Sequence, residues 1–164
     1  CVDNACIFQP ECGLEGLDPC PEGQECFSGS CLIPAGTCSE PEPITEGVFM
    51  GSTVGQPAVN TGGDSCGFGN GNGPEAVFEY TPTMSGSICV DTLQSSYDTV
   101  LYIRQGVCDM QSAEIVCNDD DETGDFSTRS ALSFSAQVDT SYYIFVDSFS
   151  SAGGTFVLNI QPCP

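Results

Sequence analysis

The sequence contains no histidine, no lysine and no tryptophan, and its only cationic side chains are Arg104 and Arg129. Without histidine or lysine, the Ser/His, Cys/His and Ser/Lys pairs of nucleophilic catalysis cannot form. Two carboxylates could serve as acid and base, as in glycosidases, but nothing in the sequence selects two of the 23 acidic residues. We therefore expect a protein that is not an enzyme.

The shortage of cationic residues leaves a formal net charge of −21. Nucleic acids and anionic lipids are bound through basic side chains, so neither is expected as a partner. No apolar run approaches the ~18 residues that cross a bilayer, and we expect no membrane insertion. The acidic surface keeps a protein soluble outside the cell, and it also offers carboxylates to divalent cations.

Twelve cysteines are present, and an even number fits complete pairing in an oxidising compartment. Zinc is the rival interpretation, but the sequence has neither histidine nor a C-x-x-C motif. A lipid-modified Cys1, as in bacterial lipoproteins, would leave an odd number of other cysteines.

Because the chain starts at Cys1 and not at Met, we expect that a secretion signal has been removed and that the protein is secreted and associated with the cell surface.

Residues 1–37 form a cysteine-rich module with almost no strand-like alternation. The stretch "CVDNACIFQPEC" aligns with "CFSGSCLIPAGTC" at residues 26–38, so the module contains one and a half repeats of about 25 residues. So short a segment needs disulfides, each contributing ~2–4 kcal/mol. Cys1 and Cys6 correspond to the back half of a repeat, and we expect them to form an inter-subunit or completion site.

Residues 38–164 have an all-β pattern, with segments rich in β-branched and aromatic residues between Gly, Asp, Ser and Pro clusters. The pattern predicts about eight strands in a jelly-roll-like β-sandwich, preceded by the small disulfide-stapled, loop-rich N-terminal module. The expected strands are 46–53, 74–82, 86–93, 98–106, 113–119, 129–137, 141–149 and 154–162.

Alternation within these strands identifies the side chains that should face the core. The expected inward set is Phe78, Tyr80, Ile88, Val90, Leu101, Ile103, Leu132, Phe134, Ile144, Val146, Phe156, Leu158 and Ile160.

The ordered blocks "GPEAVFEYTP", "SGSICVDT", "YDTVLYI", "CNDDD", "LSFSAQVDTSYYIFVDSF" and "GGTFVLNI" resemble the bacterial pre-peptidase C-terminal (PPC) domain over residues 38–164. The first 37 residues resemble short cysteine-rich repeats of secreted bacterial proteins. The resemblance implies a jelly-roll-like sandwich, secretion, and an ancillary role beside an enzyme or on a cell surface. It also implies binding of polymeric substrates and calcium in some relatives.

The stretch "CNDDDETGDF" at 117–126 carries the strongest chemical signal. Asp119, Asp121, Thr123 and Gly124 match the first, third, fifth and sixth positions of an EF-hand-like loop. Ser130 stands at the twelfth position and no helices flank the loop, so a true EF-hand is excluded. We expect calcium as the only cofactor, with oxygen ligands from Asp98, Asn118, Asp119, Asp121 and Asp125. The alternative is a solvated acidic hairpin loop.

Chain order suggests a disulfide pairing but does not decide it. Cys108 and Cys117 lie on the two sides of one loop, Cys66 and Cys89 precede and follow one strand, and Cys38 and Cys163 bracket the sandwich. In the small module, Cys12 with Cys26 and Cys20 with Cys31 is one of three connectivities.

Two functions remain after these exclusions. The first is a structural protein that assembles with copies of itself, or with adjacent modules of a larger surface protein, into a fibre, layer or adhesin stalk. The second is a module that binds an extracellular polysaccharide or protein polymer for a secreted enzyme.

Overall fold

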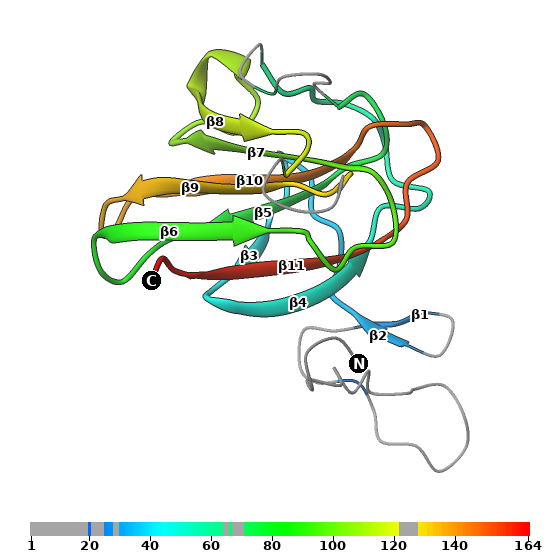
Figure 1. Cartoon of the computed structure of the whole chain (residues 1–164), viewed down its shortest axis with the longest axis horizontal. Helices are drawn as coiled ribbons and strands as arrows, with labels where there is room; N and C mark the ends of the chain where they lie inside the picture. The colour runs from blue at the N-terminus through cyan, green and yellow to red at the C-terminus, as the bar shows by residue number, and fades with distance from the viewer. Residues whose placement is uncertain (1–19, 21–24, 28–29, 64–65, 67–70, 122–127) are drawn as a thin grey trace.

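Alternating apolar and polar residues form two antiparallel-rich β-sheets that pack face to face (Figure 1). The structure, a computed structural model, describes residues 20, 25–27, 30–63, 66, 71–121 and 128–164. Within these residues the strands are β1 Glu25–Phe27, β2 Ser30–Leu32, β3 Glu42–Ile44, β4 Gly47–Ser52, β5 Ala76–Tyr80, β6 Gly86–Asp91, β7 Thr99–Gln105, β8 Glu114–Asn118, β9 Ala131–Ala136, β10 Tyr142–Ser148 and β11 Thr155–Pro162.

One sheet has the order β3-β5-β10-β7-β8 and the other has the order β4-β11-β6-β9. All eight predicted strands are confirmed, and the all-β sandwich is therefore the fold. Strand β3, which pairs parallel with β5, was not predicted because it has only three residues and contains Pro43. The β1–β2 hairpin of the N-terminal region was not predicted either.

The main core lies between the sheets and consists of the side chains that alternation predicts to face inward. Phe78 and Phe156 meet edge to face, with ring centroids 5.8 Å apart. The whole expected inward set belongs to this core, with Leu132 only partly buried. The period-two pattern therefore identified the inner face of both sheets.

The five-stranded sheet also buries its outer face. Val77, Val100, Tyr102 and Phe145 point away from the main core, yet none of them is exposed. The Tyr102 and Phe145 rings stack with centroids 4.5 Å apart. The segment between β4 and β5 covers this face: Gly71 has a φ of +60°, and a Cβ on it would collide with the Asp147 side chain.

The disulfides of the sandwich pair differently from the prediction. Cys38 bonds Cys108, Cys66 bonds Cys117, and Cys89 bonds Cys163, with Cα–Cα distances of 5.4, 4.5 and 5.0 Å. The predicted pairs Cys108–Cys117, Cys66–Cys89 and Cys38–Cys163 are therefore wrong.

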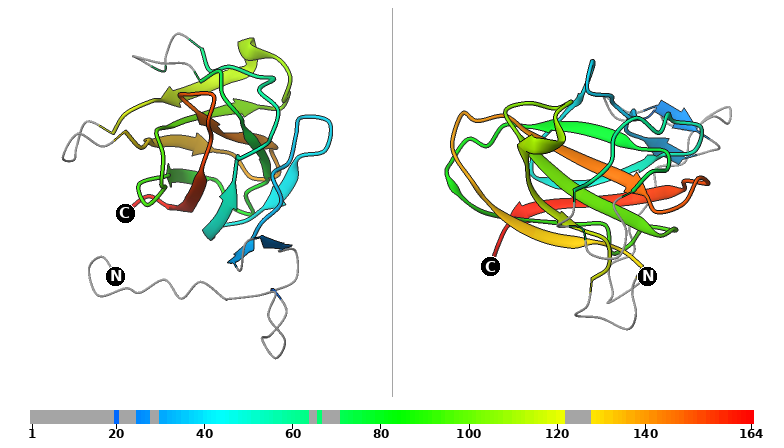
Figure 2. Two further views of the ribbon diagram at one scale, coloured as in Figure 1. Left: turned by 90° about the vertical axis from the view of Figure 1, so that its right-hand side faces the viewer. Right: turned by 90° about the horizontal axis from the view of Figure 1, so that it is seen from above.

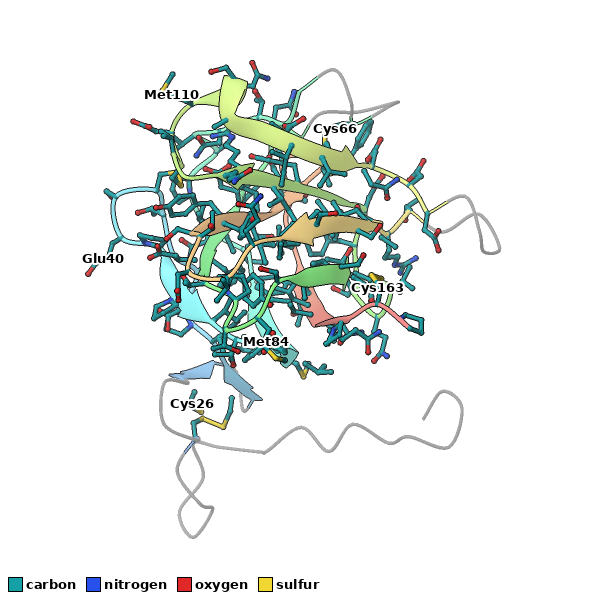
Figure 3. All side chains as sticks on the ribbon, turned by 90° about the vertical axis from the view of Figure 1, so that its left-hand side faces the viewer. Cys26, Glu40, Cys66, Met84, Met110 and Cys163 are labelled. Carbon is teal, nitrogen blue, oxygen red and sulfur yellow. A yellow bond between two sulfur atoms is a disulfide. The ribbon has the colours of Figure 1, made fainter. Side chains whose placement is uncertain are left out.

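Two of the wrong pairs, Cys66–Cys89 and Cys38–Cys163, would join opposite outer faces of the sandwich, and Figure 3 labels Cys66 near one face and Cys163 near the other. The third, Cys108–Cys117, joins two cysteines of one face, each of which has a different partner there. Cys89 is out of phase with the inward Ile88 and Val90, so it points outward from the four-stranded sheet, where the β6–β11 pairing brings it beside Cys163. Cys66, Cys108 and Cys117 pack together on the outer face of the five-stranded sheet, with Cys38 against them. A disulfide cannot join two cysteines that lie on opposite outer faces of the sandwich, because their side chains point in opposite directions.

In the N-terminal region, the predicted Cys20–Cys31 pair is confirmed, with a Cα–Cα distance of 5.3 Å. Cys1, Cys6 and Cys12 lie outside the described residues, so the Cys12–Cys26 pair and the completion site stay predictions. The β1–β2 hairpin lies beside β4 (Figures 1 and 2), and the Ile33 N–H donates to the Met50 carbonyl at 2.7 Å. The boundary between residues 37 and 38 also stays a prediction.

No helix in the described part of the chain has the length and apolar character that crossing a membrane requires.

Candidate functional site

Three carboxylates meet at one end of the sandwich because two neighbouring strands run in opposite directions. Asp98 directly precedes β7, and Asp119 and Asp120 directly follow β8. The two strands pair antiparallel, with Leu101 opposite Asn118, so the start of one lies beside the end of the other. The fold thus brings together acids that are about twenty residues apart in the sequence.

The spacing of these carboxylates suits a calcium ion. One oxygen from each of Asp98, Asp119 and Asp120 lies within 4.8 Å of the others. Calcium binds oxygens at about 2.4 Å, so ligands on opposite sides of one ion are separated by about 5 Å. A single ion can therefore contact all three side chains.

Burial distinguishes this cluster from ordinary surface acids. Asp119 is only 3% exposed, and its Oδ1 atom is buried without a hydrogen-bond partner. The Oδ1 atom of the half-buried Asp98 is also buried and unpartnered. Buried polar atoms in native proteins are nearly always satisfied, so two unpartnered oxygens at one point make this cluster a candidate cation site.

The electrostatics of the cluster lead to the same conclusion. Burial, followed by the charges of Asp120 and Asp98, raises the pKa of Asp119 to about 6. Burial and Asp120 also raise the pKa of Asp98, although the Arg129 charge opposes this shift. The Arg129 charge therefore offsets only part of the repulsion among the carboxylates, and a divalent cation would offset more of it.

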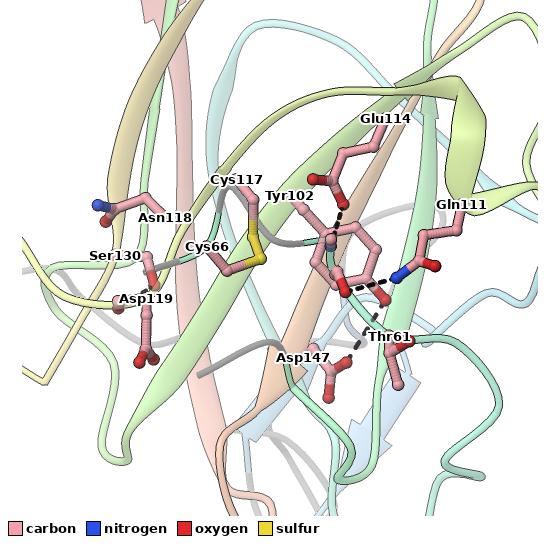
Figure 4. The surroundings of a disulfide bond; sticks show 12 residues. Thr61, Cys66, Tyr102, Gln111, Glu114, Cys117, Asn118, Asp119, Ser130 and Asp147 are labelled. Atoms are coloured by element: carbon pink, nitrogen blue, oxygen red, sulfur yellow. Dashed lines mark hydrogen bonds between the residues drawn. A yellow bond between two sulfur atoms is a disulfide. The ribbon is translucent and has the colours of Figure 1, made fainter. Parts of the chain in front are cut away.

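A buried hydroxyl network holds the backbone of the site in place. The Thr92 and Thr99 hydroxyl oxygens are 2.6 Å apart. The Ser130 hydroxyl lies 2.6 Å from the Thr99 carbonyl oxygen and 2.7 Å from the Asp119 carbonyl oxygen, and it donates to one of them at a time; Figure 4 shows Ser130 beside Asp119. Thr92, Thr99 and Ser130 are completely buried. Because these residues adjoin β6, β7 and β9, the site is anchored to both sheets.

The structure gathers only part of the predicted ligand set. Asp98 and Asp119 lie together as expected, whereas Asn118 uses its Oδ1 atom to accept from Ala131 N–H and its Nδ2 atom to donate to the Asp120 carbonyl. Asp121 lies beyond the cluster, where its N–H donates to the Arg129 carbonyl. Asp125 is outside the described residues.

Sequence reasoning missed Asp120, the third member of the cluster. The EF-hand alternation selects Asp119 and Asp121 and skips the residue between them, but the chain bends at 119–120 after β8 ends. The only available signal was the uninterrupted run of three aspartates.

A second group of metal-type ligands, Cys66, Glu114 and Cys117, does not form a metal site. The two sulfur atoms bond to each other, and the Glu114 carboxylate accepts from Gly63 N–H at 2.7 Å (Figure 4). These contacts attach the covering segment to the edge strand β8.

A cavity of about 660 Å³ opens on the outer side of the five-stranded sheet. Its walls include Val59, Glu75, Val107, Asp109 and Tyr143, together with the Cys38–Cys108 disulfide. Strand β7 separates this cavity from the carboxylate cluster, since Asp98 precedes the strand and Gly106 follows it. The cavity and the carboxylate cluster therefore lie at opposite ends of β7.

A solved structure to which the chain is similar is the pre-peptidase C-terminal domain of a collagenase from Bacillus anthracis. The two share 14% sequence identity with a TM-score of 0.49, and the match covers 74% of this chain and 95% of that domain. The PPC domain expected from the sequence blocks is thus among the structures found. No protein-family model and no curated protein matches the sequence.

Proposed function

We propose that this chain is a calcium-binding, non-enzymatic module of a secreted protein. The observation that carries the proposal is the pair of orphaned oxygens on Asp98 and Asp119 beside the Asp120 carboxylate. The ion would join the ends of β7 and β8 to the hydroxyl network that reaches the other sheet. Its role is therefore structural, and the disulfides of the sandwich are consistent with an oxidising environment.

Saturating calcium is expected to raise the melting temperature of the protein above its value in a chelator. At a free calcium concentration of 100 times Kd the ion stabilises the fold by ~2.7 kcal/mol, which corresponds to about 5–10 °C for a chain of this size. Thermal unfolding followed by circular dichroism in calcium and in EDTA measures the shift.

Two variants separate this site from general counterion binding. Asp119→Asn should abolish the calcium shift and raise the melting temperature in EDTA, because it removes one of three mutually repelling charges. Asp139→Asn makes the same charge change at an exposed turn and should leave the shift intact. Equal calcium shifts in the two variants would disprove the site.

We further propose that the module is a subunit of a surface fibre, layer or adhesin stalk. The extent of disulfide cross-linking supports this role. Because copies with a net charge of −21 repel one another, assembly should require calcium. Electron microscopy of native secreted material should show polymers that EDTA disperses, whereas monodisperse particles in calcium would refute self-assembly.

The cavity beside Tyr143 favours a second candidate function, a binding module for a secreted enzyme or surface protein. Its volume lies in the range of ligand pockets, about 300–1,000 Å³, and its walls combine apolar and acidic side chains.

A further inference from the structure

The cavity at the end of β7 has an apolar rim that solvent reaches. Val59 is 72% exposed and Val107 is 42% exposed, although both side chains are apolar. The half-buried Tyr143 ring and the Cys38–Cys108 disulfide extend this apolar surface inward. An aliphatic chain entering the cavity would therefore remove exposed apolar surface from water.

The charges at the cavity surface are negative. Glu75 and Asp109 line it, and Glu79 lies opposite Tyr143 on the neighbouring strand, where its charge helps to raise the pKa of the Tyr143 phenol. Arg104 lies beneath the cavity and is 2% exposed. Its guanidinium donates to Asn60 Oδ1 and to the Thr61 and Cys108 carbonyls, so it does not reach the opening.

We propose that this cavity binds a lysine side chain presented by a different protein. The four-carbon stem of lysine would lie against Val59 and Val107, and its ammonium group would approach the Tyr143 ring and the acidic side chains. Both carboxylate oxygens of Glu75 already accept hydrogen bonds from Asn60, and one of them also accepts from Tyr102. Glu75 therefore offers no free two-oxygen face to a guanidinium, whereas an ammonium needs only a single oxygen, and we choose lysine over arginine on this ground.

A second copy of this chain cannot supply that group. The sequence has no lysine, and its two arginines, Arg104 and Arg129, bond internally. The proposed partner is a different protein with an exposed lysine, because a copy of this sequence offers none. The inference rests on the binding-module function and not on the carboxylate cluster.

Binding can be measured by NMR titration of the intact chain at ~0.15 M salt, where long-range charge effects are screened. The probe is acetyl-Gly-Lys-Gly-amide, compared with the same peptide carrying Nε-acetyl-lysine. We expect shifts at Val59, Val107 and Tyr143 with the first peptide only. Equal binding of the acetylated peptide would overturn the inference.

Matched variants test the role of the cavity walls. Tyr143→Leu and Asp109→Asn should each weaken binding about twofold to fivefold. Asp91→Asn removes the same charge at the end of β6, on the outer face of the four-stranded sheet, and should leave binding unchanged. If Asp91→Asn weakens binding as much as Asp109→Asn, binding reflects net charge and the inference fails.

A neutral oligosaccharide such as cellobiose distinguishes failure of this inference from failure of the binding-module function. If cellobiose causes the shifts and the lysine peptide does not, the lysine inference is wrong and the binding function stands. If neither probe causes shifts at the cavity, both are wrong.

Discussion

Replacing Arg104 with methionine is expected to lower the free energy of unfolding by ~3–5 kcal/mol, because removing one partner of a buried charged network leaves the others unsatisfied. The guanidinium carbon lies 4.6 Å from the Phe145 ring centroid and 5.3 Å from that of Tyr102. The variant would leave Asn60 Oδ1 and the Thr61 and Cys108 carbonyls without their donor. It would also remove the cation nearest to the buried Glu75.

Urea denaturation of three variants isolates the contribution of the guanidinium. Arg104→Lys keeps the charge but loses the planar fork of donors, so its stability should fall between wild type and Arg104→Met. Arg129→Met serves as the control, because Arg129 is only half-buried and donates to the Ser95 carbonyl. We expect the control to lose about 1–2 kcal/mol. A loss at Arg104→Met no larger than that would show that the network does not support the fold.

Stability should fall as pH rises from about 4 to about 8, and Asp147 should account for most of the change above pH 6. Asp147 is completely buried, and burial raises its pKa from 3.8 to about 8, with the Glu75 charge contributing in the same direction. The folded state therefore keeps a proton that the unfolded state releases. This contribution is complete below pH 4 and disappears as pH approaches 8, a change of up to about 6 kcal/mol.

The change in stability between pH 6 and pH 8 can be assigned to Asp147. The Tyr102 hydroxyl oxygen lies 3.4 Å from Asp147 Oδ2 and 3.3 Å from Glu75 Oε2, so one phenol lies between two buried acids. The chain has no histidine to titrate between pH 6 and 8. Asp119, with a pKa of about 6, contributes a change of the same sign, but mainly below that window.

Asp147→Asn mimics the protonated carboxyl and should flatten the pH dependence. Chemical denaturation at pH 4, 6, 8 and 9 should show that the variant is close to wild type in stability at pH 4, more stable at pH 6, and most clearly more stable at pH 8 and 9. Asp139→Asn, at an exposed turn, should reproduce the wild-type slope. An unchanged slope in Asp147→Asn would mean that Asp147 is already ionised in the folded protein.

Local pattern was enough to predict the strands and the main core. Alternation in segments such as 74–82 and 154–162 predicted β5 and β11, and it identified Phe78 and Phe156 as inward residues that do meet. These features depend on the period of two that every strand has, and that period is visible in a single segment. The same pattern missed β3, whose three residues contain less than two periods.

Part of the carboxylate cluster was also predictable. The acidic run after β8 and the acid before β7 were both visible in the sequence. They lie together because, in an antiparallel pair, the start of one strand is beside the end of the other. The specific ligand set was not predictable. Whether Asp120 or Asp121 turns toward Asp98 depends on how the chain bends after β8, and that bend is a property of the packed loop.

The residues of this protein thus determine an acidic, disulfide-rich, all-β sandwich and its inner core, because composition and local alternation carry that information. Only the tertiary structure decided which cysteines pair, and it also showed that the five-stranded sheet is buried on both faces. Alternation assigns residues to two faces but does not say what covers the outer one. Here the β4–β5 segment covers it, and this covering brings Cys66 to Cys117 and encloses Arg104, Glu75 and Asp147.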